Sequence, residues 1–282
     1  MVKNEKAKRL SQITLACLLF TSLQAGAVTL IPWVGTADYT AAPSADGFED
    51  VVGPFDTYDF GMGAAVIDGA GGSLSVGDNL TGSYQSYVTS HEYNSTGGGT
   101  AAASNLNTTG SGSGYELTIA ADFTETITSV SGSTVEFDIT GGSVDLWFDT
   151  NPDFDFNNDT GFTSVDAILS GTIVGGSGTL ISGGLFGVTS IDILITSFNA
   201  GIFDPNTIAA GNSVFTLQIT NPTTAAFLNG ITSVNGNTID ANDLLVAADG
   251  NLALQAIPIP AAVWLFGSGL LGLVGIARRK AA

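Results

Sequence analysis

The stretch Tyr115–Phe148, which reads YELTIAADFTETITSVSGSTVEFDITGGSVDLWF, decides the fold. It consists of short segments rich in Thr, Val, Ile and Phe, separated by SGS and GGS. In the segment VEFDI (135–139), Val, Phe and Ile fall on one face and Glu and Asp on the other, because successive side chains of a strand point to opposite faces. This alternation is typical of antiparallel strands with one face in water.

Most of the remaining sequence between the termini also reads as β-structure. Gly and Ser separate nearly all the candidate strands, and no long stretch shows helical periodicity. The further candidate strands are 64–68, 165–174, 188–198, 213–220 and 244–248. We therefore expect an all-β fold, an antiparallel β-sandwich of the jelly-roll type, with a β-helix as the alternative.

One segment, 89–114, does not resemble a packed strand. It is a low-complexity segment rich in Gly, Ser, Thr, Asn and Ala, and it offers too little apolar surface to fold alone. We predict a long loop here, within an exported acidic β domain that spans 28–256. Because this loop divides the β region into a shorter front part and a longer back part, two subdomains are an alternative to one domain.

The charge distribution limits what this domain can bind. All seven Lys and Arg residues lie in the first nine positions or at 278–280, so the charged side chains of 28–256 are all acids. These carboxylates have to face water, accept hydrogen bonds or bind cations, because burying an unpaired charge is costly. The net charge of −19 also repels anionic polymers, and we therefore expect no nucleic-acid partner.

Residues 1–27 have the three parts of a Sec signal peptide. A basic region is followed by an apolar stretch at 13–23 and then by small residues. We predict cleavage after Ala27, with Ala25 and Ala27 as the small residues of the cleavage site. Cys17, the only cysteine, leaves with the signal, so no disulfide can stabilise the exported domain.

The C-terminal segment 257–282, IPIPAAVWLFGSGLLGLVGIARRKAA, has the order of a membrane signal. A Pro-x-Pro break precedes an uncharged apolar run at 261–277 and a basic end at 278–280. As a helix the run would rise roughly 25 Å, just enough to cross a hydrocarbon core of about 30 Å. Because basic ends stay cytoplasmic, we predict a transmembrane helix at 261–277 that anchors the precursor in the inner membrane with a cytoplasmic C-terminus.

The tail closely resembles the PEP-CTERM sorting signal in its V-P-L-P-A variant, in which the proline motif is followed by W-L-F-G-S-G-L-L-G and an Arg cluster. Ile259 stands where the family usually has Glu. The resemblance implies that a membrane protease of the exosortase type removes the tail and passes the protein to the cell surface or the exopolysaccharide matrix of a Gram-negative bacterium. The motif residues are Pro258, Pro260, Ala261, Arg278, Arg279 and Lys280. The alternative is an ordinary C-terminal anchor that is never cleaved.

An acidic cluster follows the stretch that decides the fold. In DLWFDTNPDFDFNNDTGF (145–162), side chains with oxygen ligands recur at every second position. Calcium takes about six to eight oxygen ligands, and no Lys or Arg competes for them here. The candidate calcium ligands are Asp149, Asp153, Asp155, Asn157 and Asp159. Asn158 and Ser164 replace the Gly and the bidentate Glu of an EF-hand, so an acidic hairpin tip that is merely solvated is the alternative.

The sequence offers little for catalysis. His91 is the only histidine and lies in the low-complexity segment, which argues against a Ser-His-Asp arrangement and against a histidine zinc site. The Gly-rich stretch 69–73 lacks the Lys of a phosphate-binding loop. Acids that could pair for glycoside hydrolysis are plentiful, but no pair stands out. We therefore expect a protein without enzymatic activity.

These features predict an exported surface or matrix protein involved in exopolysaccharide association, biofilm or floc formation. The stretches PWVGT (32–36) and AVIDGAGGSLSVGDNLTGSYQSYV (65–88) are also loosely similar to flocculation-associated PEP-CTERM proteins. The alternative is a carbohydrate-binding or carbohydrate-cleaving β domain. Its candidate aromatic platforms for sugar rings are Trp33, Tyr84, Tyr87 and Trp147.

Overall fold

The computed structural model describes residues 31–256, apart from 96, 110, 111, 113, 182–185, 209–211 and 221–224. The expected signal peptide at 1–27 and sorting signal at 257–282 lie outside the described residues. The transmembrane helix expected at 261–277 is therefore outside them too. Within the described ranges, no helix is long and apolar enough to cross a membrane.

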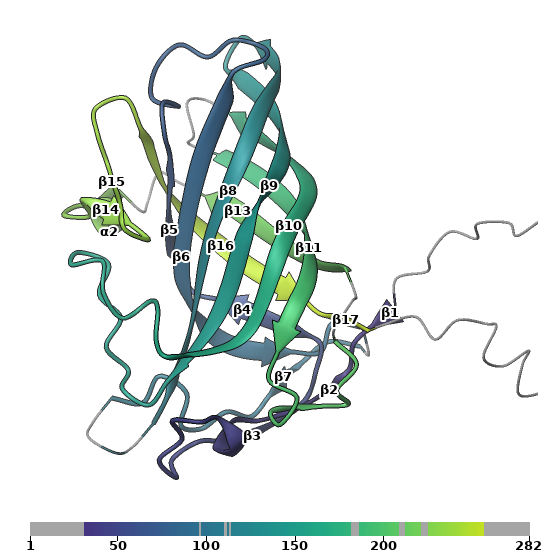
Figure 1. Ribbon diagram of the computed structural model, residues 1–282. Coiled ribbons are helices and arrows are strands. Elements are labelled where there is room, and N and C mark those ends of the chain that lie inside the picture. The colour runs from purple at the N-terminus through teal and green to yellow at the C-terminus, as the bar shows by residue number, and fades with distance from the viewer. Residues whose placement is uncertain are drawn as a thin grey trace, which may run out of the picture.

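The main sheet is a closed, eight-stranded antiparallel barrel (Figure 1), in which two short strands together take the place of one strand. Its strands are β4 (Thr57–Phe60), β5 (Gly63–Ile67), β6 (Asn79–Glu92), β8 (Glu116–Ser131), β9 (Thr134–Asp149), β10 (Asp166–Ile181), β11 (Phe186–Phe198), β13 (Asn212–Thr220) and β16 (Leu244–Ala253). From β6 to β13 each of these strands pairs with the next one in chain order, and β13 pairs with β16. The short strands β4 and β5 follow one another along the gap between β16 and β6, and together they close the barrel.

The predicted β-sandwich of the jelly-roll type is wrong, although the chain is all-β. A sandwich and a barrel require the same alternation of inward apolar and outward polar side chains, so the alternation alone does not separate them. The two folds differ in the pairing of strands far apart in the chain. Here Val214 of β13 lies opposite Ala253 of β16, and this contact turns the sheet into a closed wall.

Bulges and glycines bend the long strands into this wall. The register between β8 and β9 shifts at Thr124/Glu125, and the register between β10 and β11 shifts at Ile173/Gly175. Such bulges add twist and curvature to a strand. Gly142, with φ 141°, lies opposite Phe123 on the neighbouring strand, where an added Cβ would lie 2.0 Å from the Asp122 carbonyl oxygen. Close approach of the two backbones therefore requires glycine at this position.

The barrel interior is filled by side chains. Along β8, Leu117, Ile119 and Phe123 point inward and are almost fully buried. The Phe123 ring lies over Gly82 of β6, where an added Cβ would meet the ring at 2.2 Å. Large side chains therefore pack against glycines across the interior. The hollows that could hold a ligand lie on the outer wall.

The N-terminal part of the described chain closes the lower end of the barrel in Figure 1. It contributes β1 (Ile31–Pro32), β2 (Gly35–Asp38), the 3-10 turn η2 (Tyr39–Ala41) and β3 (Val51–Phe55). β12 (Phe203–Asp204) joins β2 and β3 in a small sheet, and β17 (Gln255–Ala256) pairs with β1. Trp33 packs between Phe55 and Phe203, and its ring N–H donates to the Pro205 carbonyl oxygen at 2.7 Å.

His91 belongs to this closed end rather than to a loop. Residues 89–92 of the predicted loop continue β6, and β7 (Thr100–Ala101) pairs with them. The His91 side chain is fully buried, with its Nε2 atom 2.7 Å from the Tyr39 hydroxyl, which lies 3.0 Å from the Tyr58 hydroxyl. Burial lowers the pKa of His91 to about 3, so the imidazole is neutral at physiological pH.

A side layer covers part of the outer wall beside β5 and β6, on the left of Figure 1. It comprises the loop 150–162, the short helix α2 (Ala225–Leu228) and a hairpin of β14 (Ser233–Val234) and β15 (Asn237–Thr238). Its apolar residues form a second small core on the barrel wall, which includes Ala64, Val66, Phe156, Phe227, Ile231 and Val234. This layer therefore makes the outer surface of the barrel uneven beside β5 and β6.

Candidate functional site

Two rows of outward-facing side chains, polar apart from Val66, run across four neighbouring strands on the outer wall. In the first row, Val66 of β5 lies opposite Ser83 of β6, Ser83 lies opposite Asp122 of β8, and Asp122 lies opposite Ser143 of β9. These residues face outward, because their neighbours Tyr84 and Phe123 fill the interior. Ser83 donates from its hydroxyl to the Asp122 carboxylate at 2.6 Å.

The second row runs beside the first. The backbone N–H of Asp68 donates to the Thr81 carbonyl oxygen at 2.9 Å, and Thr81 lies opposite Thr124. The hydroxyl groups of Thr124 and Thr140 lie 2.8 Å apart. Because adjacent strands are about 4.8 Å apart, the rows present hydroxyl and carboxylate groups at regular intervals over roughly 14 Å of the wall.

The β14–β15 hairpin forms one bank of this surface. Asn237 donates from its side-chain amide to the Ser83 hydroxyl at 2.6 Å, and Asn235 donates likewise to the Asp122 carboxylate at 3.0 Å. The hairpin is fixed by Asp159, whose carboxylate accepts from the backbone N–H groups of Asn235 (3.1 Å) and Gly236 (2.8 Å). Residues far apart in the sequence therefore meet in one hydrogen-bonded bank.

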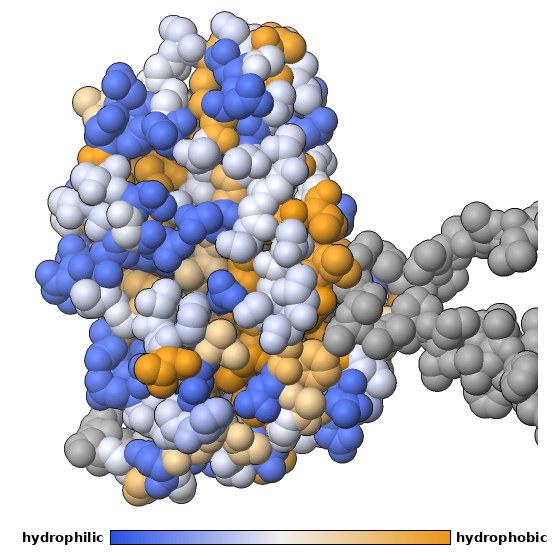
Figure 2. All heavy atoms as spheres, in the orientation of Figure 1, coloured by the Kyte–Doolittle hydropathy of each residue, from blue (hydrophilic) through white to orange (hydrophobic). Residues whose placement is uncertain are grey.

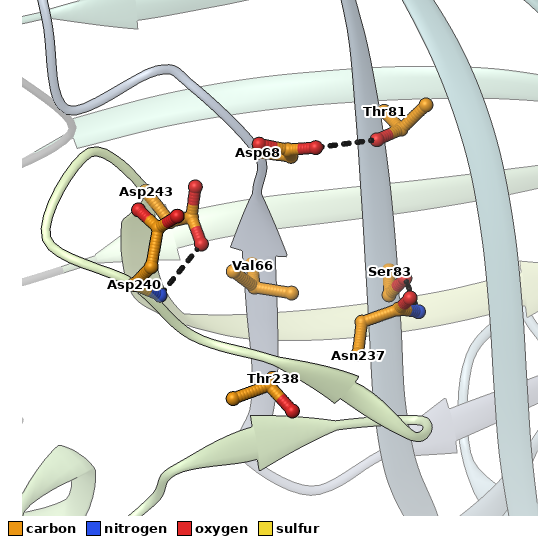
Figure 3. Close-up of a pocket in the computed structure, with 8 residues that line it drawn as sticks. All are labelled: Val66, Asp68, Thr81, Ser83, Asn237, Thr238, Asp240 and Asp243. Atoms are coloured by element: carbon orange, nitrogen blue, oxygen red, sulfur yellow. Dashed lines mark hydrogen bonds between the residues drawn. The ribbon is translucent and has the colours of Figure 1, made fainter.

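The rows and the hairpin enclose two adjoining hollows, which we call the outer groove. The first has a volume of about 160 Å³ and is drawn in Figure 3, where Asp68, Asp240 and Asp243 lie on one side and Ser83 and Asn237 on the other. The second, of about 360 Å³, continues over β8 and β9. Both hollows are lined by Thr81, Ser83 and Asn237. Figure 2 shows hydrophilic residues gathered on this side of the molecule, around the hairpin.

The outer groove is negatively charged. The Asp243 carboxylate accepts from the backbone N–H groups of Asp240 at 2.8 Å and Gly69 at 2.9 Å, and these hydrogen bonds hold the pKa of Asp243 below its usual value. Asp68 and Asp122 add two further carboxyl groups. Because residues 10–277 contain no Lys or Arg, no basic side chain of the domain can neutralise them.

This donor and acceptor set suits a ligand with many hydroxyl groups. Carboxylates accept hydrogen bonds from hydroxyl donors, the Asn237 amide donates, and Ser and Thr hydroxyls do either. The only histidine lies in the buried cluster at the closed end, so the groove has no imidazole base. The groove can therefore hold a polyhydroxylated chain by hydrogen bonds.

The hydrogen bonds of the residues predicted as calcium ligands divide them into local groups. Asp149 ends β9 and accepts from the Asn151 backbone N–H at 2.8 Å, and the Asn151 side chain contacts Asp153. Asp155 accepts from the backbone N–H groups of Asn157 (2.8 Å) and Asn158 (3.2 Å). Asp159 binds the β14–β15 hairpin instead. Among the residues described, no three His, Cys, Asp or Glu side chains are grouped to hold a metal ion, and calcium binding stays a prediction.

Glu116 is a buried acid that the sequence did not single out. It lies opposite Asp149, and neither of its carboxyl oxygens has a partner of good hydrogen-bond geometry, although the backbone N–H groups of Asp153 and Phe154 lie near enough to affect its pKa. Its pKa is raised to about 8, mainly by burial and to a smaller extent by the charges of Asp153 and Asp149, while nearby backbone N–H groups oppose the rise. Its position at the start of a strand gave no hint of this, because the loop that buries it comes later in the chain.

The aromatic side chains expected as sugar platforms are not exposed rings. Trp33 and Tyr84 are fully buried in the core. Tyr87 stacks on Phe154 with ring centroids 4.1 Å apart, which holds the loop 150–162 against the wall. Trp147 is half-buried in β9. The outer groove thus relies on polar groups rather than on stacking.

The chain matches no known protein-family model, and comparisons with curated proteins and with solved structures find no match either.

Proposed function

We propose that this chain is a non-enzymatic, exported bacterial protein of the cell surface or extracellular matrix, which associates with exopolysaccharide through the outer groove. The observation that carries this proposal is the hydrogen-bonded bank of Ser83, Asp122 and Asn237 along a polar groove on the outside of a filled barrel. Polysaccharides present the row of hydroxyl groups that such a bank would bind.

The terminal segments support the same proposal. The features of 1–27 favour export, and the tail at 257–282 favours handling by an exosortase-type protease, because it resembles a PEP-CTERM signal at Pro258, Pro260 and the basic end. Processing at the proline motif would release a domain with no Lys or Arg. Such a protein repels anionic polymers and suits a glycan without negative charge.

The test combines localisation with binding. The gene is expressed in a host with an exosortase and in the same host without it, and the surface extract is analysed by mass spectrometry. We expect a product that ends near Pro258 only in the first host, and binding of that product to the host's exopolysaccharide in a pull-down. An intact Lys280 end on the surface form, or no retention on the polysaccharide, would contradict the proposal.

The alternative is a carbohydrate-cleaving domain, and one observation favours it. The carboxyl group of Asp68 lies close enough to that of Asp243 to affect its pKa, so the groove contains two neighbouring acids. Incubation with polysaccharide and measurement of reducing ends separates the two functions. Our proposal expects bound polysaccharide and no new reducing ends.

A further inference from the structure

A second polar trough crosses the outer wall over β9, β10 and β11. Ser177 of β10 lies opposite Asp138 of β9 on one side and Ser190 of β11 on the other. These three residues line two adjoining hollows of about 400 and 600 Å³, which we call the second trough. Glu136 and Asp192 complete its polar rim. Like the outer groove, the second trough combines hydroxyl groups with carboxylates.

Glycines form the floor of the second trough, and packing accounts for only some of them. A Cβ added at Gly178 would lie 2.3 Å from the Phe137 ring, so the core requires glycine there. A Cβ added at Gly175 would meet only Asp192, at 4.0 Å. Packing in the barrel interior therefore does not explain why residue 175 is a glycine. Its effect is to leave the outer wall hollow between Asp138 and Asp192.

The two hollow surfaces adjoin at Thr124 and Thr140, whose hydroxyl groups lie 2.8 Å apart, but they cover different stretches of the wall. The outer groove extends from β5 to β9, where Gly142 and Ser143 line it, and the second trough begins on β9 at Glu136 and continues to β11. No residue lines both. The wall therefore offers two adjoining surfaces, each lined by its own residues.

We propose that the second trough is a second glycan site, so that one molecule holds two polysaccharide chains and cross-links them. The inference rests on the proposed function of the outer groove, because both surfaces offer the same chemistry. The ligand class is a neutral or amino-sugar polymer. Uronate, sulfate or phosphate groups would face Asp122 and Asp243 in one site and Asp138 and Asp192 in the other, with no Lys or Arg to offset the repulsion.

The experiment counts bound chains on the purified full-length protein by native mass spectrometry. The probes are cellohexaose, mannohexaose and a chitosan hexamer, with hexagalacturonate as the anionic counterpart. Gly175→Val fills the second trough with a strand-favouring side chain, and Asn237→Ala removes a donor of the outer groove. Thr172→Val, on the exposed face of β10 outside both sites, is the matched control.

We expect two bound oligosaccharides per wild-type molecule, one for each single variant and none for the double variant, with little binding of hexagalacturonate. Each single variant should also lose the ability to raise the viscosity of a long neutral polymer such as hydroxyethyl cellulose, while Thr172→Val keeps it. A single site lost only in Asn237→Ala would overturn the second site and leave the proposed function standing. Wild-type binding to none of the four probes would count against both. Circular dichroism verifies that Gly175→Val is folded.

Discussion

Glu116 links the stability of the barrel to pH. Because its pKa is raised to about 8 in the folded chain from an ordinary value of 4.5, the folded state holds a proton that the unfolded state releases. The stability that the protonated group contributes is fully present below about pH 4.5 and is lost as the pH rises through about 8. Glu116→Gln, which imitates the protonated form, should gain roughly 1–3 kcal/mol over the wild type at pH 8 and almost nothing at pH 4.5.

Urea unfolding of both proteins at a series of pH values measures this difference. Glu136→Gln is the control, because it removes the same negative charge from an exposed position on the neighbouring strand without changing a buried group. A stability difference between Glu116→Gln and the wild type that does not grow between pH 4.5 and pH 8 would contradict the assignment.

Tyr39 connects two buried polar groups at the closed end of the barrel. Its hydroxyl lies within hydrogen-bond distance of both His91 and Tyr58. Tyr39→Phe leaves these groups buried with one partner fewer, so we expect a loss of about 1–3 kcal/mol in the free energy of unfolding. Tyr93→Phe, at a partly exposed position, should change it by much less. Equal losses in the two variants would mean that the buried hydrogen bonds contribute little.

At the scale of elements, the β14–β15 hairpin should decide how well the outer groove binds. Asp159 holds the hairpin through two backbone N–H groups but does not line the groove. Asp159→Ala should therefore loosen the hairpin and weaken glycan binding several-fold while the barrel keeps its melting temperature. Hydrogen exchange of 233–238 and calorimetric titration with oligosaccharide measure the two effects. Unchanged hydrogen exchange of 233–238 together with weaker oligosaccharide binding would contradict the role of Asp159 in holding the hairpin.

The same elements show what the sequence could and could not predict. The alternation in VEFDI is confirmed, because Phe137 and Ile139 are buried while Glu136 and Asp138 are exposed. Local periodicity identifies a strand and its wet face, since both depend on neighbouring residues only. The outer groove could not be predicted in this way. Ser83 and Asn237 are 154 positions apart, and only the register of the strands and the packing of the hairpin bring them together.

For the whole molecule, repulsion among acids is the main electrostatic effect. The formal net charge is −19, and the described chain contains no Lys or Arg to oppose it. Added salt shortens the screening length from about 30 Å at 0.01 M to about 3 Å at 1 M, so the melting temperature at pH 7 should rise by several degrees over that range. Near pH 4.1, the isoelectric point, the rise should largely vanish. An equal rise at both pH values would indicate a general salt effect instead.

Closure of the main sheet by β13 and β16 also determines how this protein can meet a partner. An open sheet can pair with a neighbouring chain through the unpaired backbone N–H and C=O groups of its edge strand. Such pairing depends little on the side chains of either chain. In the part of the chain that the structure describes, the closed wall has no such free edge, so copies of the protein cannot join edge to edge through it. A partner that binds this wall has to be recognised by side chains. Single substitutions can therefore change the binding specificity without changing the fold of the barrel.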